Sequence, residues 1–394
     1  MSERGNELKI LIVCSDFPYP ANHGGRVDTW GRIKALHALG VHLDLVVCGN
    51  PQQPTPEELD MVRQYADRIA FAEAKGRLPQ LLRWLPYQVE KRETLRTVHL
   101  GREDYNFILL EGDAMYAIVD NPAVMRMKAK LVLRVHNDEV TYFQALARST
   151  GKWMHKVYYY LESLKFKWLQ GRILKRIDTY MFISSKEHEK FAALHPEKRS
   201  LFLPPPVQLE QMAAYRPETR KVVFIGSLFM PNNREAIEWY LHHIHPRMLH
   251  HEEYRFVIAG NSRGQRLTWL DKFDLDRVEV YDTPESLDDI YDSGCLFVNP
   301  MRNGAGVKLK TIEAIQYGLP VLSTSIGCEG TGLQDGVHIL IADELQLFYE
   351  KLSGLYENPA MRKRLLAESQ QFIRAQYDHQ GLLRDFLVSD TNAI

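Results

Sequence analysis

The sequence predicts an α/β protein built from two tandem doubly wound domains, on three observations. Short β-rich segments alternate with helical segments almost throughout the chain, as in parallel sheets with crossover helices. The 394 residues exceed one ordinary core and suit two domains. The run Leu203–Pro206 (LPPP) interrupts both patterns, because proline lacks a backbone donor and restricts the residue before it. We therefore expect domains at 1–204 and 205–373, with a C-terminal helix at 374–394 that completes the first.

The first domain is expected to open with a βαβ unit. Lys9–Ser15 is apolar on both faces, which is typical of a buried parallel strand. Arg26–Leu39 has helical periodicity, and Val41–Cys48 is the next strand. The right-handed crossover between the strands predicts a Rossmann-like, doubly wound sheet. Further strands are expected at Phe107–Glu111, Leu131–His136 and Thr179–Ser184.

A second series of the same kind begins after the prolines. Its first strand is Lys221–Ile225 and its first helix is Arg234–Leu249. Two such sheets in tandem are expected to face a cleft between the domains, and ligands bind at the carboxyl ends of these strands. The remaining elements are strands at Arg255–Ala259, Val278–Tyr281, Cys295–Asn299 and Pro320–Ser323, and helices at Lys308–Tyr317, from Glu344 and from Pro359.

Composition excludes several classes of function. The net charge of −1 provides no field that would attract nucleic acid. The four cysteines stand singly, so neither a zinc site nor a disulfide framework is indicated. The N-terminal segment lacks the apolar core and cleavage site of a signal peptide, and no apolar run is long enough to span a membrane. We expect a cytoplasmic protein.

The strongest local signal is Asn299–Thr324, in which a strand leads through a loop with Gly304 and Gly306 into a helix. Glycine amides and a helix N-terminus form an anion site, since both turn backbone N–H groups toward the ligand. Lys308, at the start of the helix, adds a full charge, and Glu313 is placed to accept hydrogen bonds from two ribose hydroxyls. A glycine-lined turn with solvated lysines is the structural alternative.

A second glycine turn, Gly24–Gly25, precedes the first helix and is either another anion site or only a tight turn. The three-glycine fingerprint of NAD-binding sheets is absent, which argues against a dinucleotide. His136 ends the strand LVLRVH at the edge where a cleft is expected. A histidine at such a place is either a structural or a catalytic residue.

Asn299–Thr324 resembles the C-terminal signature of glycosyltransferase family 4, which comprises retaining GT-B enzymes that use nucleotide sugars. The similarity covers most of the chain, and it is strong in the second domain and loose in the first. The other segments that carry it are Val223–Trp239 (VFIGSLFMPNNREAIEW), Phe256–Gly260 (FVIAG), Ser323–Gly330 (STSIGCEG), Asp335–Leu340 (DGVHIL), the N-terminal SDFPYPANHGGR, and LRVHNDE around His136.

The resemblance implies transfer, with retention, of a hexose-type sugar from a nucleoside diphosphate sugar to an acceptor hydroxyl, without a metal or other cofactor. The first domain is then the acceptor side and the second the donor side. Carbohydrate or lipid-linked acceptors of polysaccharide or glycolipid synthesis are expected. The resemblance implies catalytic roles for His136, on the transferred sugar or the phosphates, and for Lys308. The predicted donor-binding residues are Gly24, Gly25, Arg26, Gly226, Ser227, Gly304, Ala305, Gly306, Val307 and Glu313.

Two departures from the family pattern matter. The family carries two glutamates separated by seven residues; Glu313 matches the second, but Ala305 replaces the first, which removes a contact with the donor sugar. The family also places Arg and Lys on the diphosphate after the first strand of the second domain, where this chain has Ser227 and two asparagines. We therefore expect Lys308 and Arg26 to bind more of the phosphate charge.

Three alternatives remain open. A metal-dependent transferase is suggested by the carboxylate pairs in Glu111–Asp113 and Asp274–Asp276, each of which could hold Mg²⁺ or Mn²⁺. A nucleotide-sugar epimerase has the same fold and needs no acceptor. A non-catalytic nucleotide-sugar-binding protein is suggested by Ala305.

Two aromatic segments have an undecided role. Gly151–Arg176 holds seven lysines and arginines against one acid, Glu162, with aromatic residues between them. It is either a helix with a buried aromatic face or a surface for peripheral contact with an anionic membrane, at the inner face. Leu78–Pro86 is similarly ambiguous.

Overall fold

The computed structural model describes residues 7–22, 24–49, 54–207, 209–216, 218–304 and 306–391. It divides into two compact units, unit 1 with Met1–Pro206 and His379–Ile394, and unit 2 with Val207–Asp378. The division follows the proline run that interrupts the sequence pattern. The segment predicted as one helix at 374–394 belongs to two helices, because α13 (Pro359–Gln376) ends in unit 2 and α14 (His379–Thr391) lies in unit 1.

Unit 1 contains a sheet of seven parallel strands in the order β3-β2-β1-β4-β5-β6-β7. The chain moves one way from β1 to β3 and the other way from β4 to β7, which confirms the predicted doubly wound sheet. The strands are β1 (Lys9–Cys14), β2 (His42–Gly49), β3 (Arg68–Glu73), β4 (Phe107–Glu111), β5 (Lys130–Val135), β6 (Thr179–Phe182) and β7 (Arg199–Phe202).

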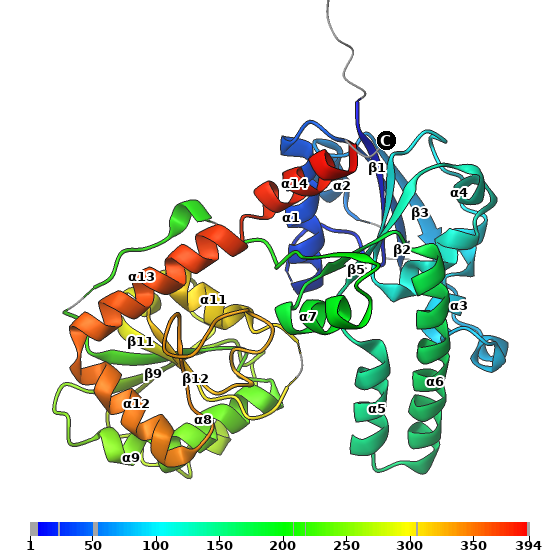
Figure 1. The fold of residues 1–394 in the computed structure, drawn as a ribbon. Helices are drawn as coiled ribbons and strands as arrows, with labels where there is room; N and C mark the ends of the chain where they lie inside the picture. Colours follow the sequence, from blue (N-terminus) through cyan, green and yellow to red (C-terminus); the bar gives the residue numbers. More distant parts are fainter. Residues whose placement is uncertain are drawn as a thin grey trace, which may run out of the picture. The chain divides into compact units, whose positions relative to one another are not determined.

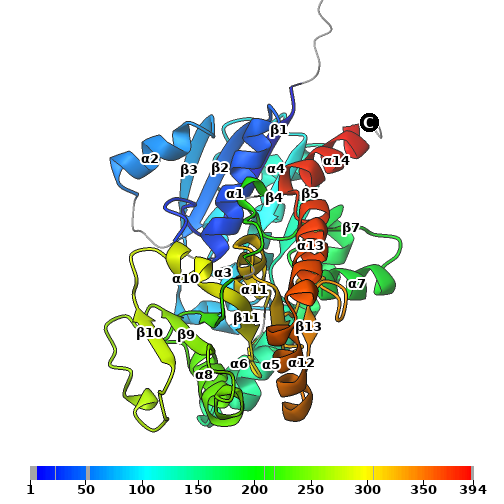
Figure 2. The same ribbon diagram turned by 90° about the vertical axis from the view of Figure 1, so that its left-hand side faces the viewer.

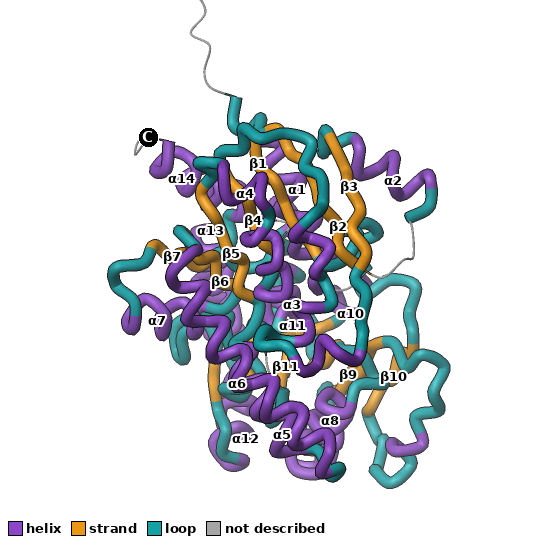
Figure 3. Tube along the Cα trace, turned by 90° about the vertical axis from the view of Figure 1, so that its right-hand side faces the viewer, coloured by secondary structure: helices purple, strands orange, loops and turns teal. Residues whose placement is uncertain are grey.

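Helices cover both faces of this sheet. α1 (Gly24–Ala38) and α14 pack on one face, in a core that includes Ile33 and Phe386 (Figure 2). η3 (Asp113–Asp120) and α6 (Trp153–Arg176) pack on the other face, and Figure 3 shows α6 on that side. α5 (Glu139–Ser149) packs along α6, and the two helices project from the sheet as a hairpin (Figure 1). The shorter helices are α2 (Pro56–Arg63), η1 (Leu78–Leu82), α3 (Tyr87–Glu90), η2 (Glu93–Arg96), α4 (Pro122–Arg126) and α7 (Ser185–Leu194).

Unit 2 contains six parallel strands in the order β10-β9-β8-β11-β12-β13. α8 (Pro231–His243) and α12 (Leu345–Glu357) cover one face, where the rings of Trp239 and Phe348 pack edge to face with 5.3 Å between their centres. α11 (Leu309–Gln316) and α13 cover the other face (Figure 1). The other elements are β8 (Lys221–Ile225), β9 (Arg255–Gly260), β10 (Val278–Asp282), β11 (Gly294–Asn299), β12 (Val321–Ser323), β13 (Leu340–Ile341), η4 (Leu209–Gln211), α9 (His245–Met248), η5 (Thr268–Leu270) and α10 (Asp288–Asp292).

The predicted elements agree with the structure best where a strand is buried on both faces. β4 and β8 coincide with the predicted strands. The predicted helix Arg234–Leu249 is instead α8 followed by α9, because Pro246 cannot donate the hydrogen bond that a continuous helix needs. β3, β7 and β13 are absent from the predicted elements. All three lie at a sheet edge, where strands carry a weaker apolar signal.

All four cysteines are free and buried, as their single spacing predicts. Burial raises the pKa of Cys295 to about 12 and that of Cys328 to about 11. These thiols therefore remain protonated at neutral pH. Across the described residues, no helix combines the length and the apolar content that crossing a membrane requires.

Candidate functional site

The strand order of unit 2 reverses between β8 and β11. β8 leads through α8 to β9 on one side, whereas β11 leads through α11 to β12 on the other. Two loops that leave neighbouring strands in opposite directions open a crevice above the carboxyl ends of the strands, and open α/β sheets bind ligands there. The loops after β8 and β11 are therefore the candidate site of unit 2.

A glycine in the loop after β8 lets a lysine side chain approach the backbone closely. Gly226 follows the strand, and Asn233 on α8 donates from Nδ2 to the Ser227 carbonyl at 3.0 Å. The Lys310 ammonium, on the first turn of α11, donates to Oδ1 of Asn233. A Cβ atom at position 226 would lie 2.8 Å from Lys310 Nζ and 3.0 Å from Asn233 Nδ2. Glycine at this position therefore lets the ammonium and the Asn233 amide pack directly against the backbone of the loop.

Lys310 is a cation in a poorly solvated place. Its ammonium lies 4.7 Å from the centre of the Phe224 ring. Burial, and after it the charge of Lys308, lower the pKa of Lys310 to about 7. Asn233 is a neutral acceptor, and the charge of Glu313 offsets the lowering of the pKa in part. A desolvated ammonium at the reversal of a sheet favours an anionic ligand.

The loop after β11 carries the predicted glycines. Gly304 and Gly306 have φ angles of 120° and 84°, which glycine adopts without strain. A Cβ atom on Gly304 would come within 3.0 Å of Asn232 Nδ2, so this loop approaches the start of α8 closely. Val307 is half-buried, and the predicted residue Ala305 lies outside the described residues.

Lys308, the predicted phosphate ligand, turns back into its own loop. Its side chain is buried, and Nζ donates to the carbonyls of Gly304 at 3.1 Å and Gly306 at 2.6 Å. Burial lowers the pKa of Lys308, partly offset by Glu329. Lys308 therefore shapes the glycine loop, and Lys310 is the lysine beside Gly226. The prediction that Lys308 contacts a phosphate stays a prediction.

Glu313 lies on the second turn of α11 and its side chain reaches solvent. The surrounding protein removes part of the water around the carboxyl and raises its pKa, which the charge of Lys310 partly lowers again. A carboxylate in this position can accept hydrogen bonds from two hydroxyls of a ligand. The role predicted for Glu313, on a ribose, remains a prediction.

Unit 1 holds a buried charge network where its own strand order reverses, between β1 and β4. Arg32 donates to both carboxylate oxygens of Glu111, at 2.9 and 2.7 Å, and to Asp28 at 2.8 Å. Arg134 donates to both oxygens of Asp28, at 2.9 and 2.7 Å. Burial alone would raise the pKa of Asp28, but Arg134 and Arg32 hold it well below its usual range. Two carboxylates and two guanidiniums thus compensate one another.

His136 lies against this network at the end of β5. Its ring Nε2 is 3.5 Å from a carboxylate oxygen of Asp28 and 3.7 Å from one of Glu111. A Cβ atom on Gly112 would come within 3.4 Å of Nδ1, and the φ angle of Gly112 is 94°. The side chain is 29% exposed, so the ring has one edge on the carboxylates and remains open to a ligand on another side.

Sequence reasoning missed Asp28 and Arg32. Both lie on the buried face of α1, one helical turn apart, and a carboxylate and an arginine at this spacing on an otherwise apolar face are an unusual pattern. That pattern was the available signal. It does not reveal the partners on β4 and β5, because those depend on the tertiary fold.

The first glycine turn lies where it was expected. α1 begins at Gly24, so Gly24 and Gly25 are in its first turn, and the space around Gly24 is open. Arg26 donates to both carboxylate oxygens of Asp16, at 2.7 and 2.9 Å, and this contact raises the pKa of Arg26. Its charge is already paired within unit 1, which is unfavourable to the predicted role of Arg26 on a phosphate.

The alternative metal site in Glu111–Asp113 does not assemble. Both oxygens of Glu111 accept hydrogen bonds from Arg32, and Asp113 lines a separate cavity. Asp28, Glu111 and His136 are close enough to surround an ion, but the two arginines already satisfy the carboxylates. This donor set does not suit a divalent cation.

The second alternative metal site is a local turn. In Asp274–Asp276, a carboxylate oxygen of Asp274 accepts a hydrogen bond from the backbone amide of Asp276 at 3.0 Å. An aspartate that bonds to the amide two residues further along is a common turn geometry. The contact therefore accounts for Asp274 without an ion.

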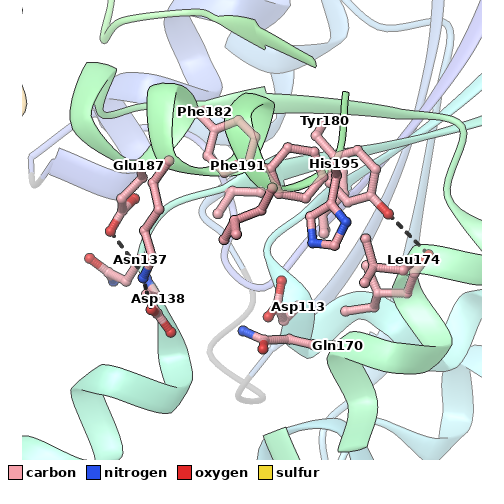
Figure 4. A pocket seen from close by; sticks show the side chains of 15 residues that line it. Asp113, Asn137, Asp138, Gln170, Leu174, Tyr180, Phe182, Glu187, Phe191 and His195 are labelled. Carbon is pink, nitrogen blue, oxygen red and sulfur yellow. Dashed lines mark hydrogen bonds and ion pairs between the residues drawn. The ribbon is translucent and has the colours of Figure 1, made fainter. Parts of the chain in front are cut away.

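A cavity of about 200 Å³ opens in unit 1 at the carboxyl ends of β5 and β6 (Figure 4). α6 and α7 close its sides. Aromatic rings form one wall, and the polar groups face it. The rings are Tyr180, Phe182 and Phe191, and the polar side chains are Asp113, Asn137, Asp138, Gln170, Glu187, Lys190 and His195.

Asp113 points into this cavity beside Gln170 and His195 (Figure 4). Burial, and after it the charges of Glu139 and Asp138, raise the pKa of Asp113 to about 7. At neutral pH the carboxyl is therefore partly protonated, so that it can donate as well as accept a hydrogen bond. Carboxyl, amide and aromatic groups around a cavity of this size suit a polyhydroxylated ligand.

Comparisons with known proteins identify the family. Residues 219–358 match the model of the glycosyl transferases group 1. A Klebsiella pneumoniae protein described as an uncharacterized 44.6 kDa protein in cps region is 36% identical over 389 residues, which cover 94% of this chain and 96% of that protein. The chain belongs to the group 1 glycosyltransferases.

Solved structures confirm the GT-B fold of this glycosyltransferase. Sucrose-phosphate synthase from Thermosynechococcus elongatus has a TM-score of 0.66 at 15% identity, over 98% of this chain and 99% of that chain. Anabaena Alr3699/HepE in complex with UDP-glucose has a TM-score of 0.63 at 10% identity, over 98% and 100%. WaaG, a glycosyltransferase involved in lipopolysaccharide biosynthesis, has a TM-score of 0.60 at 14% identity, over 96% and 99%.

We predict that Arg134→Met destabilises the glycosyltransferase by about 3–5 kcal/mol, because it leaves Asp28 buried with half of its charge compensation removed. Urea unfolding at neutral pH measures the loss. Arg26→Met is the matched control; it breaks the partly exposed pair with Asp16 and should cost less than about 1 kcal/mol. Equal losses in the two variants would contradict a dominant role for the buried network.

We predict that Asp113 makes the wild-type enzyme less stable as the pH rises from about 4 to 7. The folded state retains a proton on this carboxyl up to a pKa of about 7, whereas the unfolded chain releases it near its ordinary value, so deprotonation favours unfolding. Asp113→Asn should abolish a loss of about 3 kcal/mol across this range. The free energy of unfolding at pH 5 and pH 7.5 tests this, with exposed Asp385→Asn as control. If the unfolding free energy differs between pH 5 and pH 7.5 by the same amount in Asp113→Asn as in the wild type, the prediction is refuted.

Proposed function

We propose that this enzyme moves a hexose-type sugar from a nucleoside diphosphate sugar to an acceptor hydroxyl during polysaccharide or glycolipid assembly. The observation that carries the proposal is the poorly solvated Lys310 ammonium packed against Gly226, at the strand reversal of unit 2. The relative in a cps region and the neighbour crystallised with UDP-glucose support the same substrate class.

In this proposal the diphosphate lies over the loops after β8 and β11. Lys310 and the N-terminus of α11 supply positive charge, and the φ angles of Gly304 and Gly306 let the second loop fold closely around the ligand. Glu313 accepts hydrogen bonds from the ribose hydroxyls. Gly226 lets the Lys310 ammonium lie against the loop after β8, and the backbone of Gly226 and Ser227 faces the diphosphate in this proposal.

We infer that the departing diphosphate is stabilised by these fixed charges and needs no metal ion. The bond from the anomeric carbon to the phosphate oxygen breaks, and a bond to the acceptor oxygen forms. With retention, the acceptor attacks from the side of the leaving group, and the departing phosphate oxygen takes its proton. In the same proposal, His136 contacts the transferred sugar or the phosphates.

We propose that the cavity at Asp113 receives the carbohydrate part of the acceptor. The aromatic wall can pack against the faces of a sugar, while Asp113, Asn137 and Gln170 exchange hydrogen bonds with its hydroxyls. Both a carbohydrate acceptor and a lipid-linked acceptor fit this assignment. A place at the inner face of the membrane is part of the same proposal.

We predict that nucleotide sugars raise the melting temperature and that Gly226→Ala weakens donor binding at least tenfold. The new Cβ atom displaces the flexible end of Lys310, so stability should change little. Titration calorimetry and thermal shift with uridine, guanosine and adenosine diphosphate sugars measure both effects. Gly354→Ala, at an exposed position on α12 with open space around it, is the control.

Each failure of that experiment has a clear meaning. Unchanged affinity in Gly226→Ala contradicts the donor site, and loss of transfer in EDTA contradicts metal independence. Conversion of the sugar of the nucleotide sugar into its epimer, with no acceptor present, would identify an epimerase. Binding without transfer to any acceptor would identify a non-catalytic protein.

We predict that donor binding at pH 8 takes up close to one proton. The free protein holds Lys310 with a pKa of about 7, so its amine is mostly neutral at pH 8, and a neighbouring diphosphate raises that pKa. Calorimetry in buffers with different ionisation enthalpies measures the uptake. Lys310→Met should abolish it, whereas Lys363→Met, exposed on α13, should retain it. Uptake that persists in Lys310→Met belongs to another group and contradicts the assignment.

A further inference from the structure

α6 carries apolar side chains on two opposite faces. On one face, Phe166, Leu169 and Ile173 are buried in the core of unit 1. On the other face, six large side chains are each at least 46% exposed and recur three or four residues apart, which aligns them along one side of the helix. We call them the apolar stripe: Trp153, Val157, Tyr160, Leu161, Leu164 and Trp168. An apolar surface of this extent in water marks an interaction site.

Basic side chains border the apolar stripe. By their helical spacing, Lys156 and Lys167 follow one edge of it, and Lys165 and Arg172 follow the other. Glu162 is buried, and its carboxylate accepts from Lys165 Nζ and from the backbone amide of Tyr87, both at 2.8 Å. Lys165 is therefore paired with Glu162, and Arg172 lies 3.7 Å from a carboxylate oxygen of Asp120, so the net positive charge of the border comes from Lys156 and Lys167.

The surface continues onto the segment that holds η1. Lys165 Nζ donates to the Leu81 carbonyl at 2.7 Å, which holds this segment beside α6. Trp84 and Trp168 line the same shallow hollow. Trp84 is 84% exposed and Leu82 is 91% exposed. Two segments that are far apart in the sequence therefore present tryptophan and leucine to solvent on one surface of unit 1.

We propose that the apolar stripe and the η1 segment dock this glycosyltransferase on an anionic lipid bilayer. Tryptophan prefers the headgroup level of a membrane, and lysines beside it are attracted to anionic lipid by about 1 kcal/mol each. The stripe lies along a helix whose other face belongs to a folded core, so the helix rests in the plane of the interface.

Charge complementarity selects the bilayer over a second copy of the chain. A twofold contact between two such stripes would bring Lys156 and Lys167 of each copy toward the like charges of the other. Anionic headgroups compensate those lysines instead. The inference rests on the proposed function in one respect, because a lipid-linked acceptor would be presented at the same bilayer.

Co-sedimentation of the full chain with vesicles tests the docking surface. At low salt the wild type should bind vesicles of about 30% phosphatidylglycerol in phosphatidylcholine and should bind pure phosphatidylcholine much less. Trp153→Ser with Trp168→Ser should lower the partition coefficient at least tenfold. Lys156→Gln with Lys167→Gln should lower it about fivefold for each lysine and remove most of its salt dependence. The matched controls in unit 2 are Leu347→Ser and Lys363→Gln, both at exposed positions.

The outcomes separate this surface from the donor site. Wild-type protein that stays in solution, or stripe variants that bind as the wild type does, would overturn the docking proposal. A concentration-dependent dimer that the tryptophan substitutions abolish, without vesicle binding, would assign the stripe to a second copy. Thermal shift by nucleotide sugars in the stripe variants shows that they fold and reports on the proposed function separately.

Discussion

Both units depend on one constraint, the reversal of strand order inside a parallel sheet. In unit 1 the order reverses between β1 and β4, and in unit 2 between β8 and β11. At these places the loops after two adjacent strands run in opposite directions. Side chains that follow the two strands therefore lie close together with no loop covering them. Unit 1 fills the opening with Arg32, Arg134, Asp28 and Glu111, whose charges cancel, and places His136 against them. Unit 2 leaves a lysine beside a glycine.

Desolvation of the Lys310 ammonium in unit 2 disfavours folding, and a bound anion would offset this unfavourable free energy. A pKa lowered to about 7 means that the protein has withdrawn water from the Lys310 ammonium without supplying a full counter-charge. Sequences depart from good packing and solvation mainly at functional sites. Lys308 makes the contrast clear, because two loop carbonyls accept its hydrogen bonds. Lys310 donates to one such oxygen, on Asn233, and in our proposal it is the lysine that meets the diphosphate.

Local patterns predicted the parts of the site that depend on local structure. The glycines at 24, 25, 226, 304 and 306 follow strands or open helices, as their spacing indicates. The sequence could not show that Lys310, and not Lys308, lies beside Gly226, because this depends on which side chain faces the loop of another strand. The same holds for Asp28 and Arg134, which are joined only by the folded sheet. Edge strands such as β3 and β7 lack the apolar pattern of the central ones.

α6 shows why the membrane question could not be decided from the sequence. Phe166 in Gly151–Arg176 is buried, as the interpretation with a buried aromatic face expects, whereas Trp153 is exposed, and contact with a membrane stays a prediction. Apolar residues on two opposite faces of a helix leave no one-sided pattern in the sequence, and it is this pattern that would distinguish a core helix from an interfacial one. Only the arrangement of α5 and the sheet reveals which face is covered (Figure 3).

The two proposals for unit 1 meet on this helix. Trp168 ends the apolar stripe, and Gln170, two residues further along, lines the cavity that holds Asp113. A helix with its side chains is about 10 Å across, so a sugar in the cavity would lie about one helix diameter from the lipid surface. A diphosphate link between lipid and sugar spans a distance of that order. Under the two proposals together, α6 would keep the sugar of a lipid-linked acceptor close to the membrane while its hydroxyl enters the enzyme.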